Sequence, residues 1–249
     1  GKTTVDANND QIVSGITQDI TEQKQLQQQK DDFISIASHE LKTPITSLKA
    51  SIQLLERLKN NPTSPMLPNL INQASASLNK VSLLINDLLN ASKVMEGQLV
   101  LNKTEFVVAE LIEDSIFHAK AAGNIDVQIE GDMDVKVFAD AHRIDQVIVN
   151  FVNNAIKYAP DSKVLRIAIE RTEQGAKVSV IDQGAGIPEE KLSHLFNRYY
   201  RADEKGQPYS GIGLGLYICS EIIKRHHGKV GVESEVGKGS TFWFIIPYH

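Results

Sequence analysis

Two long segments of the chain repeat their apolar residues at steps of three and four, the spacing of one face of an α-helix. They lie within residues 30–98, and residues 59–68 between them contain prolines and asparagines that break a helix. A hairpin of two helices has no closed core, so we expect two copies of the chain to pair as a homodimer in a four-helix bundle. The apolar seam expected to meet helix partners consists of Leu67, Ile71, Ala74, Leu78, Val81, Ile85, Leu88 and Met95.

After Gly97 the pattern changes to short alternating or apolar runs interleaved with helical segments. Alternation of apolar and polar residues is typical of β-strands with one buried face. We therefore predict an α+β domain over residues 99–249, an α/β sandwich with its helices on one face of the sheet. The expected strands are residues 126–130, 164–170, 177–181, 229–233 and 241–246, and the expected helices are approximately residues 107–121, 142–157 and 214–226.

Residues 1–29 are polar and carry few large apolar groups. The last part of this segment favours a helix but has almost no apolar face, so we interpret it as a connector. Residues 14–22 resemble the end of a PAS sensor domain, which implies that the chain begins with a PAS tail and a signalling helix.

Composition narrows the class of protein. The chain has 249 residues, 41% of them hydrophobic, and a formal net charge of −5, which is typical of a globular protein with one large or two modest domains. The single cysteine, Cys219, excludes a disulfide framework and a Cys-based zinc cluster. The mild acidity provides no field that would attract nucleic acid, and no apolar run approaches the roughly 18 residues that a bilayer span requires.

One histidine in the first helical segment is predicted to face water. At about 100° per residue the apolar residues fall within one stripe, and His39 lies about 160° from its centre. Thr43 lies one turn further on the same side, and Glu40 follows His39 directly. A neutral imidazole is a good nucleophile near neutral pH, and a neighbouring carboxylate can orient it and take its proton. The stripe consists of Phe33, Ala37, Leu41, Leu48, Ile52 and Leu55.

Residues 38–44, which read Ser-His-Glu-Leu-Lys-Thr-Pro, resemble the H box of two-component sensor histidine kinases. The resemblance implies that His39 is the phospho-acceptor, that Glu40 is its general base and that Thr43 supports phosphatase activity. These three are therefore the candidate catalytic residues.

The common glycine-rich phosphate loops are missing. Residues 237–240 have neither the glycine spacing of a P-loop nor a Ser or Thr directly after the lysine. Residues 211–215 lack the dinucleotide-binding spacing, and no plausible strand precedes them.

A different set of residues offers nucleotide chemistry. Asn150, Asn154 and Lys157 share one helix face, where amide oxygens suit Mg2+ and the ammonium group suits phosphate. Asp182 follows a predicted strand, and its carboxylate can accept a hydrogen bond from the exocyclic amine of adenine, which guanine cannot supply at that position. Residues 210–216 open the next helix, where backbone N–H groups can hold phosphates.

In order and spacing these motifs resemble the N, G1 and G2 boxes of the histidine-kinase ATP-binding domain of the Bergerat or GHKL type. Residues 195–201 look like its F box and residues 237–242 like its last glycine motif, whereas Ile212 stands where the family commonly has a small hydroxyl residue. The resemblance implies ATP and Mg2+, with Asn150 and Asn154 as metal ligands. The implied nucleotide-binding residues are Asn150, Asn154, Lys157, Tyr158, Asp182, Gly184, Gly186, Ile187, Arg198, Gly211, Gly213, Leu214, Gly215, Leu216 and Thr241.

Three further residues are predicted to be structural. His226 and His227 close a helix before Gly228, where histidines interact favourably with the helix C-terminus. Trp243 is assigned to the core.

The resemblance implies an enzyme, a protein histidine kinase that phosphorylates His39 from ATP. The phosphoryl group would pass to an aspartate of a response regulator receiver domain, with phosphatase activity toward that regulator. Residues 1–29 would be the connector, residues 30–98 the dimerisation and histidine phosphotransfer domain, and residues 99–249 the catalytic ATP-binding domain. The implied location is the bacterial cytoplasm, with a membrane anchor only in segments upstream, and no nucleic-acid partner is expected.

Two other classes remain open. A GHKL ATPase or chaperone-like machine shares the asparagine and glycine motifs but hydrolyses ATP with a glutamate ahead of the metal asparagine, and the residue four before Asn150 is Gln146. A pure interaction module would be a dimeric bundle with a degenerate nucleotide fold, and ATP analogues would not stabilise it.

Overall fold

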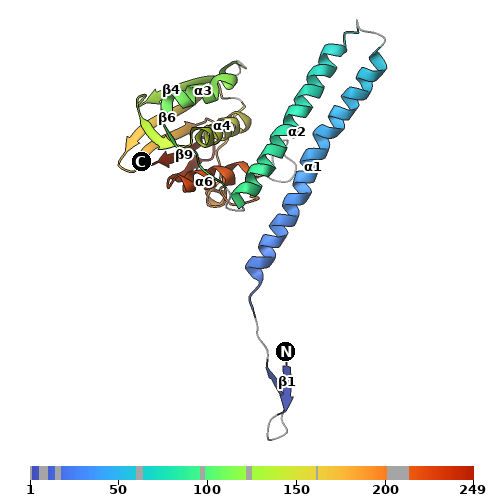
Figure 1. The fold of residues 1–249 in the computed structure, drawn as a ribbon, viewed down its shortest axis with the longest axis vertical. Helices are drawn as coiled ribbons and strands as arrows, with labels where there is room; N and C mark the ends of the chain where they lie inside the picture. The colour runs from blue at the N-terminus through green and yellow to red at the C-terminus, as the bar shows by residue number, and fades with distance from the viewer. Residues whose placement is uncertain are drawn as a thin grey trace. The chain divides into compact units, whose positions relative to one another are not determined.

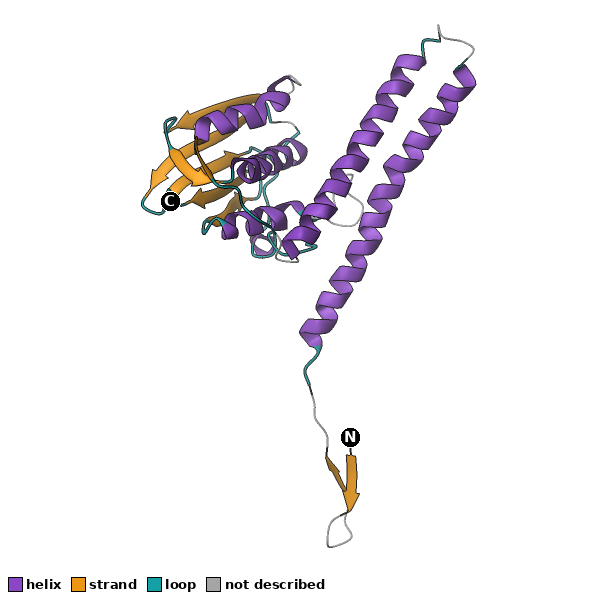
Figure 2. Cartoon of the chain, viewed as in Figure 1, coloured by secondary structure: helices purple, strands orange, loops and turns teal. Residues whose placement is uncertain are grey.

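The computed structural model describes residues 2–5, 11–14, 18–59, 64–95, 99–121, 125–160, 162–200 and 213–249. The chain divides into two compact units, residues 1–39 and residues 40–249. Figure 1 labels the elements along the chain, and Figure 2 distinguishes helices from strands.

The first unit contains a two-stranded hairpin and the beginning of a long helix. β1 (Lys2–Val5) and β2 (Gln11–Ser14) pair antiparallel. Helix α1 (Thr21–Leu58) follows, and the Asp19 carboxylate accepts a hydrogen bond of 2.8 Å from the backbone N–H of Thr21. This bond satisfies one of the donors that the first turn of a helix leaves without a partner. The helix therefore begins well before the first predicted arm of the hairpin.

The predicted pair of long helices is confirmed. α1 has 38 residues, and α2 (Leu67–Met95) has 29. The side-chain amide of Gln73 on α2 donates a hydrogen bond of 3.3 Å to the hydroxyl of Ser47 on α1. In the part of the chain that the structure describes, neither these helices nor any other combine the length and the apolar character that crossing a bilayer requires.

The buried positions of α2 recur every seven residues, the repeat of helices that wind around one another. They are not the positions of the predicted seam, most of which are half-buried or exposed. Ile71, Leu78 and Ile85 keep 53%, 54% and 45% of their surface exposed. A stripe of large apolar groups is therefore uncovered in the single chain. The buried positions are Leu70, Ser77, Leu84 and Ala91.

The second unit also contains a five-stranded sheet in the order β4-β6-β7-β9-β8. β4 and β6 are parallel, and the other neighbours are antiparallel. All five predicted strands are confirmed, and so is the α+β class. The strands are β4 (Asp126–Gly131), β6 (Val164–Thr172), β7 (Gly175–Ile181), β8 (Lys229–Glu235) and β9 (Gly239–Ile246).

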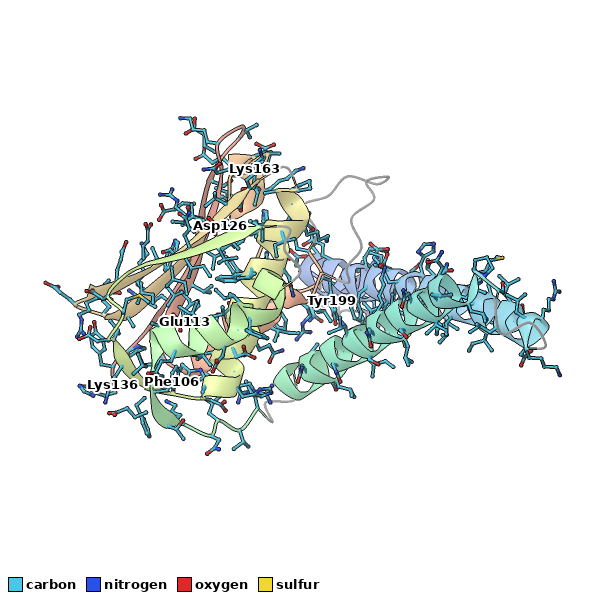
Figure 3. The ribbon with its side chains drawn as sticks, turned by 90° about the horizontal axis from the view of Figure 1, so that it is seen from above. Phe106, Glu113, Asp126, Lys136, Lys163 and Tyr199 are labelled. Carbon is cyan, nitrogen blue, oxygen red and sulfur yellow. The ribbon has the colours of Figure 1, made fainter. Side chains whose placement is uncertain are left out.

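A second, two-stranded sheet is not predicted by the sequence pattern. β3 (Thr104–Val107) pairs antiparallel with β5 (Lys136–Ala139). Figure 3 labels Phe106 and Lys136, one on each of these strands. Because each strand has only four residues, alternation within it is too short to stand out from the surrounding sequence.

The sheet carries its helices on one face, as predicted (Figure 2). Phe151, near the middle of the central helix α4, packs against Phe242 and Phe244 of β9, with ring centroids 5.5 and 6.2 Å apart. Burial of these large rings holds α4 on the sheet. The helices are α3 (Val108–Ala121), α4 (Ala141–Tyr158) and α6 (Gly215–Arg225), and the short helix α5 (Glu189–Leu192), which was not predicted, follows β7.

Trp243 lies outside this core. It alternates with Phe242 and Phe244 along β9, so its side chain lies on the opposite face of the sheet, where it is partly exposed. The indole lies against Gly231 of β8, because a Cβ there would come within 2.3 Å of Trp243 Cζ2. The prediction that Trp243 belongs to the core is wrong.

A buried histidine joins the ends of α4 and α6. Nε2 of His226 accepts a hydrogen bond of 3.0 Å from the backbone N–H of Asp140, and Nδ1 lies 2.8 Å from the carbonyl oxygen of Ile222. Because one ring nitrogen accepts and the other donates, the imidazole is neutral. His226 therefore caps α6 as predicted, but as a neutral group and not as a cation.

Residues 99–102, which precede β3, are held by hydrogen bonds to Asp140 and to Arg225. Asp140 accepts hydrogen bonds from the backbone N–H of Arg143, as the N-cap of α4, and from the backbone N–H of Asn102, at 3.1 and 2.8 Å. Nη1 of Arg225 donates a bond of 2.7 Å to the carbonyl oxygen of Leu99, whose side chain is buried. Residues 99–102 are therefore held against the sheet domain.

The buried His226 predicts that the stability of the sheet domain depends on pH. Burial lowers the pKa of His226 below its ordinary value of about 6.5, so the unfolded chain binds a proton first as pH falls. Stability should be full above about pH 6.5 and fall as the pH drops toward the lowered pKa. The single tryptophan, Trp243, lies in this domain, so its fluorescence during denaturation at pH 7.5 and 5.5 measures the effect.

The His226→Gln variant should lose much of this pH dependence, although it is less stable throughout. The exposed His142 on α4 provides the matched control, and His142→Gln should keep the wild-type slope. An equal slope in wild type and in His226→Gln would contradict the explanation.

Candidate functional site

The three candidate catalytic residues lie on α1, which continues through all of them as one helix. His39 and Thr43 are exposed, and Glu40 is half-buried. His39 therefore faces solvent, as its position relative to the apolar stripe predicts. A spacing of four residues places Thr43 one turn from His39 on the same side of the helix.

The two candidate metal ligands meet on α4. Both Asn150 and Asn154 are half-buried, and Nδ2 of Asn154 donates a hydrogen bond of 3.1 Å to Oδ1 of Asn150. α6 begins directly beside them, because a Cβ at Gly215 would come within 2.3 Å of Asn150 Nδ2. Glycine at this position allows the backbone of the α6 N-terminus to approach the amides, where its N–H groups can meet phosphate oxygens.

The amide oxygens of Asn150 and Asn154 are ligands that suit a magnesium ion. The described residues contain no group of three or more His, Cys, Asp or Glu side chains that could hold a metal ion. Magnesium is commonly bound by few protein oxygens, together with water and the phosphates of a substrate. Two side-chain amide oxygens on α4, beside the start of α6, are compatible with that mode of binding.

Lys157 and Tyr158 lie at the end of the same helix. Nζ of Lys157 donates a hydrogen bond of 2.8 Å to the Tyr158 hydroxyl and lies 4.4 Å from the centroid of its ring. Lys157 shares the helix face of Asn150 and Asn154, as predicted from its spacing. The two residues thus form one amphipathic group at the edge of the site.

Asp182 is the buried acid of the site. It follows β7 and keeps only 6% of its surface exposed. Its Oδ1 accepts hydrogen bonds from the backbone N–H groups of Gly184, at 2.8 Å, and Ser240, at 3.2 Å. Burial raises the pKa of Asp182, and the two hydrogen bonds oppose that rise. Since both bonds end on Oδ1, the carboxylate retains acceptor capacity on Oδ2 for a ligand.

The loop after β7 is clamped by the turn between β8 and β9. The N–H of Gly237 donates to the carbonyl of Ala185 over 2.8 Å. Gly186 has φ 71°, and a Cβ there would lie 2.1 Å from the carbonyl oxygen of Glu235. Only glycine accommodates both the left-handed conformation and this approach. A depression of about 350 Å3 at this place is lined by Ile181, Asp182, Glu233, Ser234, Glu235, Lys238, Gly239, Ser240 and Thr241.

Ser240, which the motifs did not single out, lies beside Asp182. Ser240 is buried, and its backbone exchanges hydrogen bonds with Asp182 in both directions. Thr241 alternates with Phe242, which faces α4, so the Thr241 side chain lies on the opposite face of the sheet, and it contributes to the lining of the depression. The pattern Gly-Ser-Thr gave no signal to choose between the two hydroxyls, because the choice depends on which face of β9 each occupies.

Arg198 lies between two tyrosines. Its guanidinium carbon lies 5.5 Å from the ring of Tyr199, which Figure 3 labels, and 5.2 Å from the ring of Tyr217 on α6. Nη2 also donates a bond of 3.3 Å to the Tyr217 hydroxyl. The predicted F box is therefore connected to the helix that the G2 box opens.

The remaining predicted residues surround the start of α6 and the loop after β7. Gly213 has φ 74°, and Leu214 is buried directly before the first residue of α6. Ile187 and Leu216 are half-buried. Gly211 lies outside the described residues.

Two family models match the chain. Residues 29–97 match the His Kinase A (phospho-acceptor) domain, and residues 139–249 match the histidine kinase-, DNA gyrase B-, and HSP90-like ATPase. The chain belongs to the sensor histidine kinase family. It is 35% identical over 229 residues to the adaptive-response sensory kinase SasA of Gloeothece citriformis, a match that covers 88% of this chain and 58% of that protein. The chain spans less than two thirds of the length of this relative kinase.

Solved structures of histidine kinases share the fold. The catalytic domain of ThkA is 35% identical, with a TM-score of 0.50, and the match covers 59% of this chain and 96% of that domain. ThkA in complex with the response regulator protein TrrA is 25% identical, with a TM-score of 0.62, and the match covers all of this chain and 74% of ThkA. The architecture of a helical hairpin followed by an α/β ATPase domain is therefore that of the kinase family.

The buried acid of the site predicts a gain of stability on its neutralisation. Because folding raises the pKa of Asp182, the folded state binds its proton more tightly, and stability falls as the pH rises from about 3.8 through the raised pKa. Asp182→Asn keeps an oxygen that can accept the two backbone bonds but carries no charge. It should raise the melting temperature at pH 7.5, and the gain should shrink toward pH 4.

Thermal melts followed by Trp243 fluorescence measure this difference. Asp126→Asn provides the control, because Asp126 is exposed on β4 of the same sheet. A melting temperature at pH 7.5 that is lower in Asp182→Asn than in wild type would show that the carboxylate stabilises the fold.

Proposed function

We propose that the chain is the catalytic core of an ATP-dependent protein histidine kinase that phosphorylates itself on His39. The observation that carries the proposal is the close approach of Gly215, the first residue of α6, to Asn150, in a domain where the buried Asp182 directly follows β7. The exposed His39 supplies a nucleophile outside that domain. Membership of the kinase family supports the same assignment.

The site residues divide the recognition of ATP between them. Asp182 accepts a hydrogen bond from the adenine amine, which selects adenine over guanine. Asn150 and Asn154 hold Mg2+ through their amide oxygens, and the N–H groups at the start of α6 contact phosphate oxygens. Lys157 and Arg198 add positive charge for the phosphates. When bound, the metal neutralises charge on the phosphates during transfer.

The chemical step takes place on the imidazole of His39. One ring nitrogen forms a bond to the γ-phosphorus while the bond from that phosphorus to the β,γ-bridging oxygen breaks, and ADP leaves. Glu40 accepts the proton that the other ring nitrogen loses. Positioning and neutralisation of charge supply most of the rate enhancement, as in other phosphoryl transfers.

A response regulator is the proposed acceptor of the phosphoryl group. Its receiver domain would dock over the exposed His39. A carboxylate oxygen of a receiver aspartate would form a bond to the phosphorus while the bond from the phosphorus to the His39 nitrogen breaks, and the imidazole would regain a proton. ThkA, which shares the fold over the whole length of this chain, forms a complex with such a regulator. In the proposed phosphatase activity, Thr43 and Glu40 would position a water that attacks the phosphorus, so that the bond to the receiver aspartate breaks and inorganic phosphate leaves.

The working form is proposed to be a homodimer. Ile71, Leu78 and Ile85 recur every seven residues on α2 and stay about half exposed, and Ile45 and Ile52 on α1 behave alike, at 49% and 46%. Single chains rarely leave such a continuous apolar stripe in water. A second copy of the hairpin would cover it and complete the four-helix bundle.

The alternative of direct ATP hydrolysis is less well supported. Its water-activating base would precede Asn150 on α4, and the residue four positions earlier is Gln146. Oε1 of Gln146 accepts a hydrogen bond of 3.2 Å from Arg143, and a neutral amide has no basicity with which to take a proton. Transfer to a separate nucleophile such as His39 therefore agrees better with α4.

Autophosphorylation tests the proposed nucleophile directly. Incubation with ATP labelled on its γ-phosphate and Mg2+ should yield a protein-bound phosphate that is labile in acid and stable in base. His39→Gln should abolish the label, whereas His142→Gln, which removes an exposed histidine on α4, should leave it unchanged. Persistence of the label in His39→Gln would exclude His39 as the phospho-acceptor.

The adenine contact predicts a second result. A nucleotide that binds only the folded state stabilises it, by about 2.7 kcal/mol at a hundred times its dissociation constant. Mg-ATP should raise the melting temperature of wild type but not that of Asp182→Asn, while Asp126→Asn should respond like wild type. No response in wild type would favour the interaction module over the kinase.

A further inference from the structure

The hydroxyl of Ser234 on β8 takes part in three hydrogen bonds. It accepts a bond of 2.8 Å from the backbone N–H of Ile187 and donates one of 2.9 Å to the carbonyl oxygen of Gly239. The hydroxyl of Ser240 lies 2.9 Å away. A hydroxyl has one proton and two lone pairs. Since the proton of Ser234 goes to Gly239, Ser240 must be the donor in the third bond.

These three bonds join both segments that surround Asp182. Ile187 belongs to the loop after β7, in which Gly184 donates its N–H to the Asp182 carboxylate over 2.8 Å. Ser240 donates its N–H to the same oxygen over 3.2 Å and accepts a bond from the Asp182 N–H over 2.9 Å. Ser234 therefore ties the loop on one side of the carboxylate to the strand on its other side.

The backbone around this tie has little freedom. A Cβ at Gly239 would lie 2.1 Å from the carbonyl oxygen of Asp182, and one at Gly186 would lie 2.1 Å from that of Glu235. Both glycines have positive φ, at 100° and 71°. The loop after β7 and the start of β9 approach so closely that the distance between them depends on the hydrogen bonds that connect them. Ser234 makes hydrogen bonds to both segments.

We propose that Ser234 is a positioning residue that sets the orientation of the Asp182 carboxylate and thereby the preference of the site for adenine. It acts through Ile187 and Ser240. The inference rests on the proposed function, in which Asp182 accepts the adenine amine. It adds a residue whose loss should weaken recognition of the base and leave recognition of the triphosphate at α4 and α6 intact.

The ratio of GTP to ATP dissociation constants separates this role from a merely structural one. General loosening of the domain weakens both nucleotides alike, whereas a displaced carboxylate weakens only the one that carries the adenine amine. Calorimetric titration of the whole chain with Mg-ATP and Mg-GTP gives both constants. In Ser234→Ala we expect ATP binding to weaken about tenfold, the effect of roughly one lost hydrogen bond to a charged group. GTP binding should change little.

Three variants keep the test decisive. Ser234→Thr retains the hydroxyl and should restore most of the ATP preference, and Ser234→Cys, a weaker hydrogen-bonding group, should be intermediate. Ser179→Ala is the matched control, because Ser179 is a buried serine on β7 of the same sheet. It should keep the wild-type ratio. If Ser234→Ala does not fold, the order of wild type, Thr and Cys decides the question.

The outcomes distinguish this inference from the proposed function. If wild type prefers ATP and Asp182→Asn does not, the adenine contact stands, and an unchanged ratio in Ser234→Ala and Ser234→Cys would overturn the role of Ser234 alone. If wild type and Asp182→Asn bind both nucleotides equally, the adenine contact and the role of Ser234 both fall.

Discussion

One buried carboxylate constrains the architecture of the sheet domain. Asp182 keeps 6% of its surface exposed, and a charge in such a place is tolerated only when hydrogen bonds compensate for lost water. Gly184 and Ser240 provide them through their backbone N–H groups. These backbone donors reach the carboxylate only because the chain passes very close to it. Glycines at 184 and 239 allow this approach, because a Cβ at either position would collide with Asp182. The antiparallel pairing of β7 with β9 brings Ser240 next to Asp182.

The other half of the site depends on a helix with two different faces. α4 buries Phe151 against β9 and places Asn150 and Asn154 beside the start of α6. The packing that stabilises the domain therefore also fixes the amides relative to the backbone donors of α6. A buried hydrogen bond between Asp140 and His226 also fixes α4 relative to α6, because it joins the beginning of α4 to the end of α6.

Sequence patterns predicted the parts of this structure that repeat. The five strands of the main sheet and its three helices have periodic apolar positions, and they appear within a few residues of the expected bounds. β3 and β5 were not predicted, because a strand of four residues is too short to show a clear alternation of apolar and polar positions. The roles of Ser234 and Ser240 were not predicted for a different reason. The hydrogen-bond partners of a serine in a strand depend on the register of β8 and β9, which the sequence does not show. Trp243 was misplaced because hydrophobicity predicts burial but does not determine which face of β9 it occupies.

The helical hairpin exposes both a histidine and a stripe of apolar residues to solvent. Under the proposed function His39 receives a phosphoryl group from one domain and gives it to another protein, so it must be reachable by both in turn and cannot be buried in either. The apolar stripe through Ile71, Leu78 and Ile85 is exposed for the opposite reason, because a single hairpin has nothing to cover it. Under the proposed function, pairing of two hairpins would cover this stripe together with the exposed Ile52 of α1. His39 would stay exposed, because it lies about 160° from the centre of the apolar stripe of α1 that includes Ile52. The proposed dimerisation and the proposed phosphotransfer would therefore use different faces of α1.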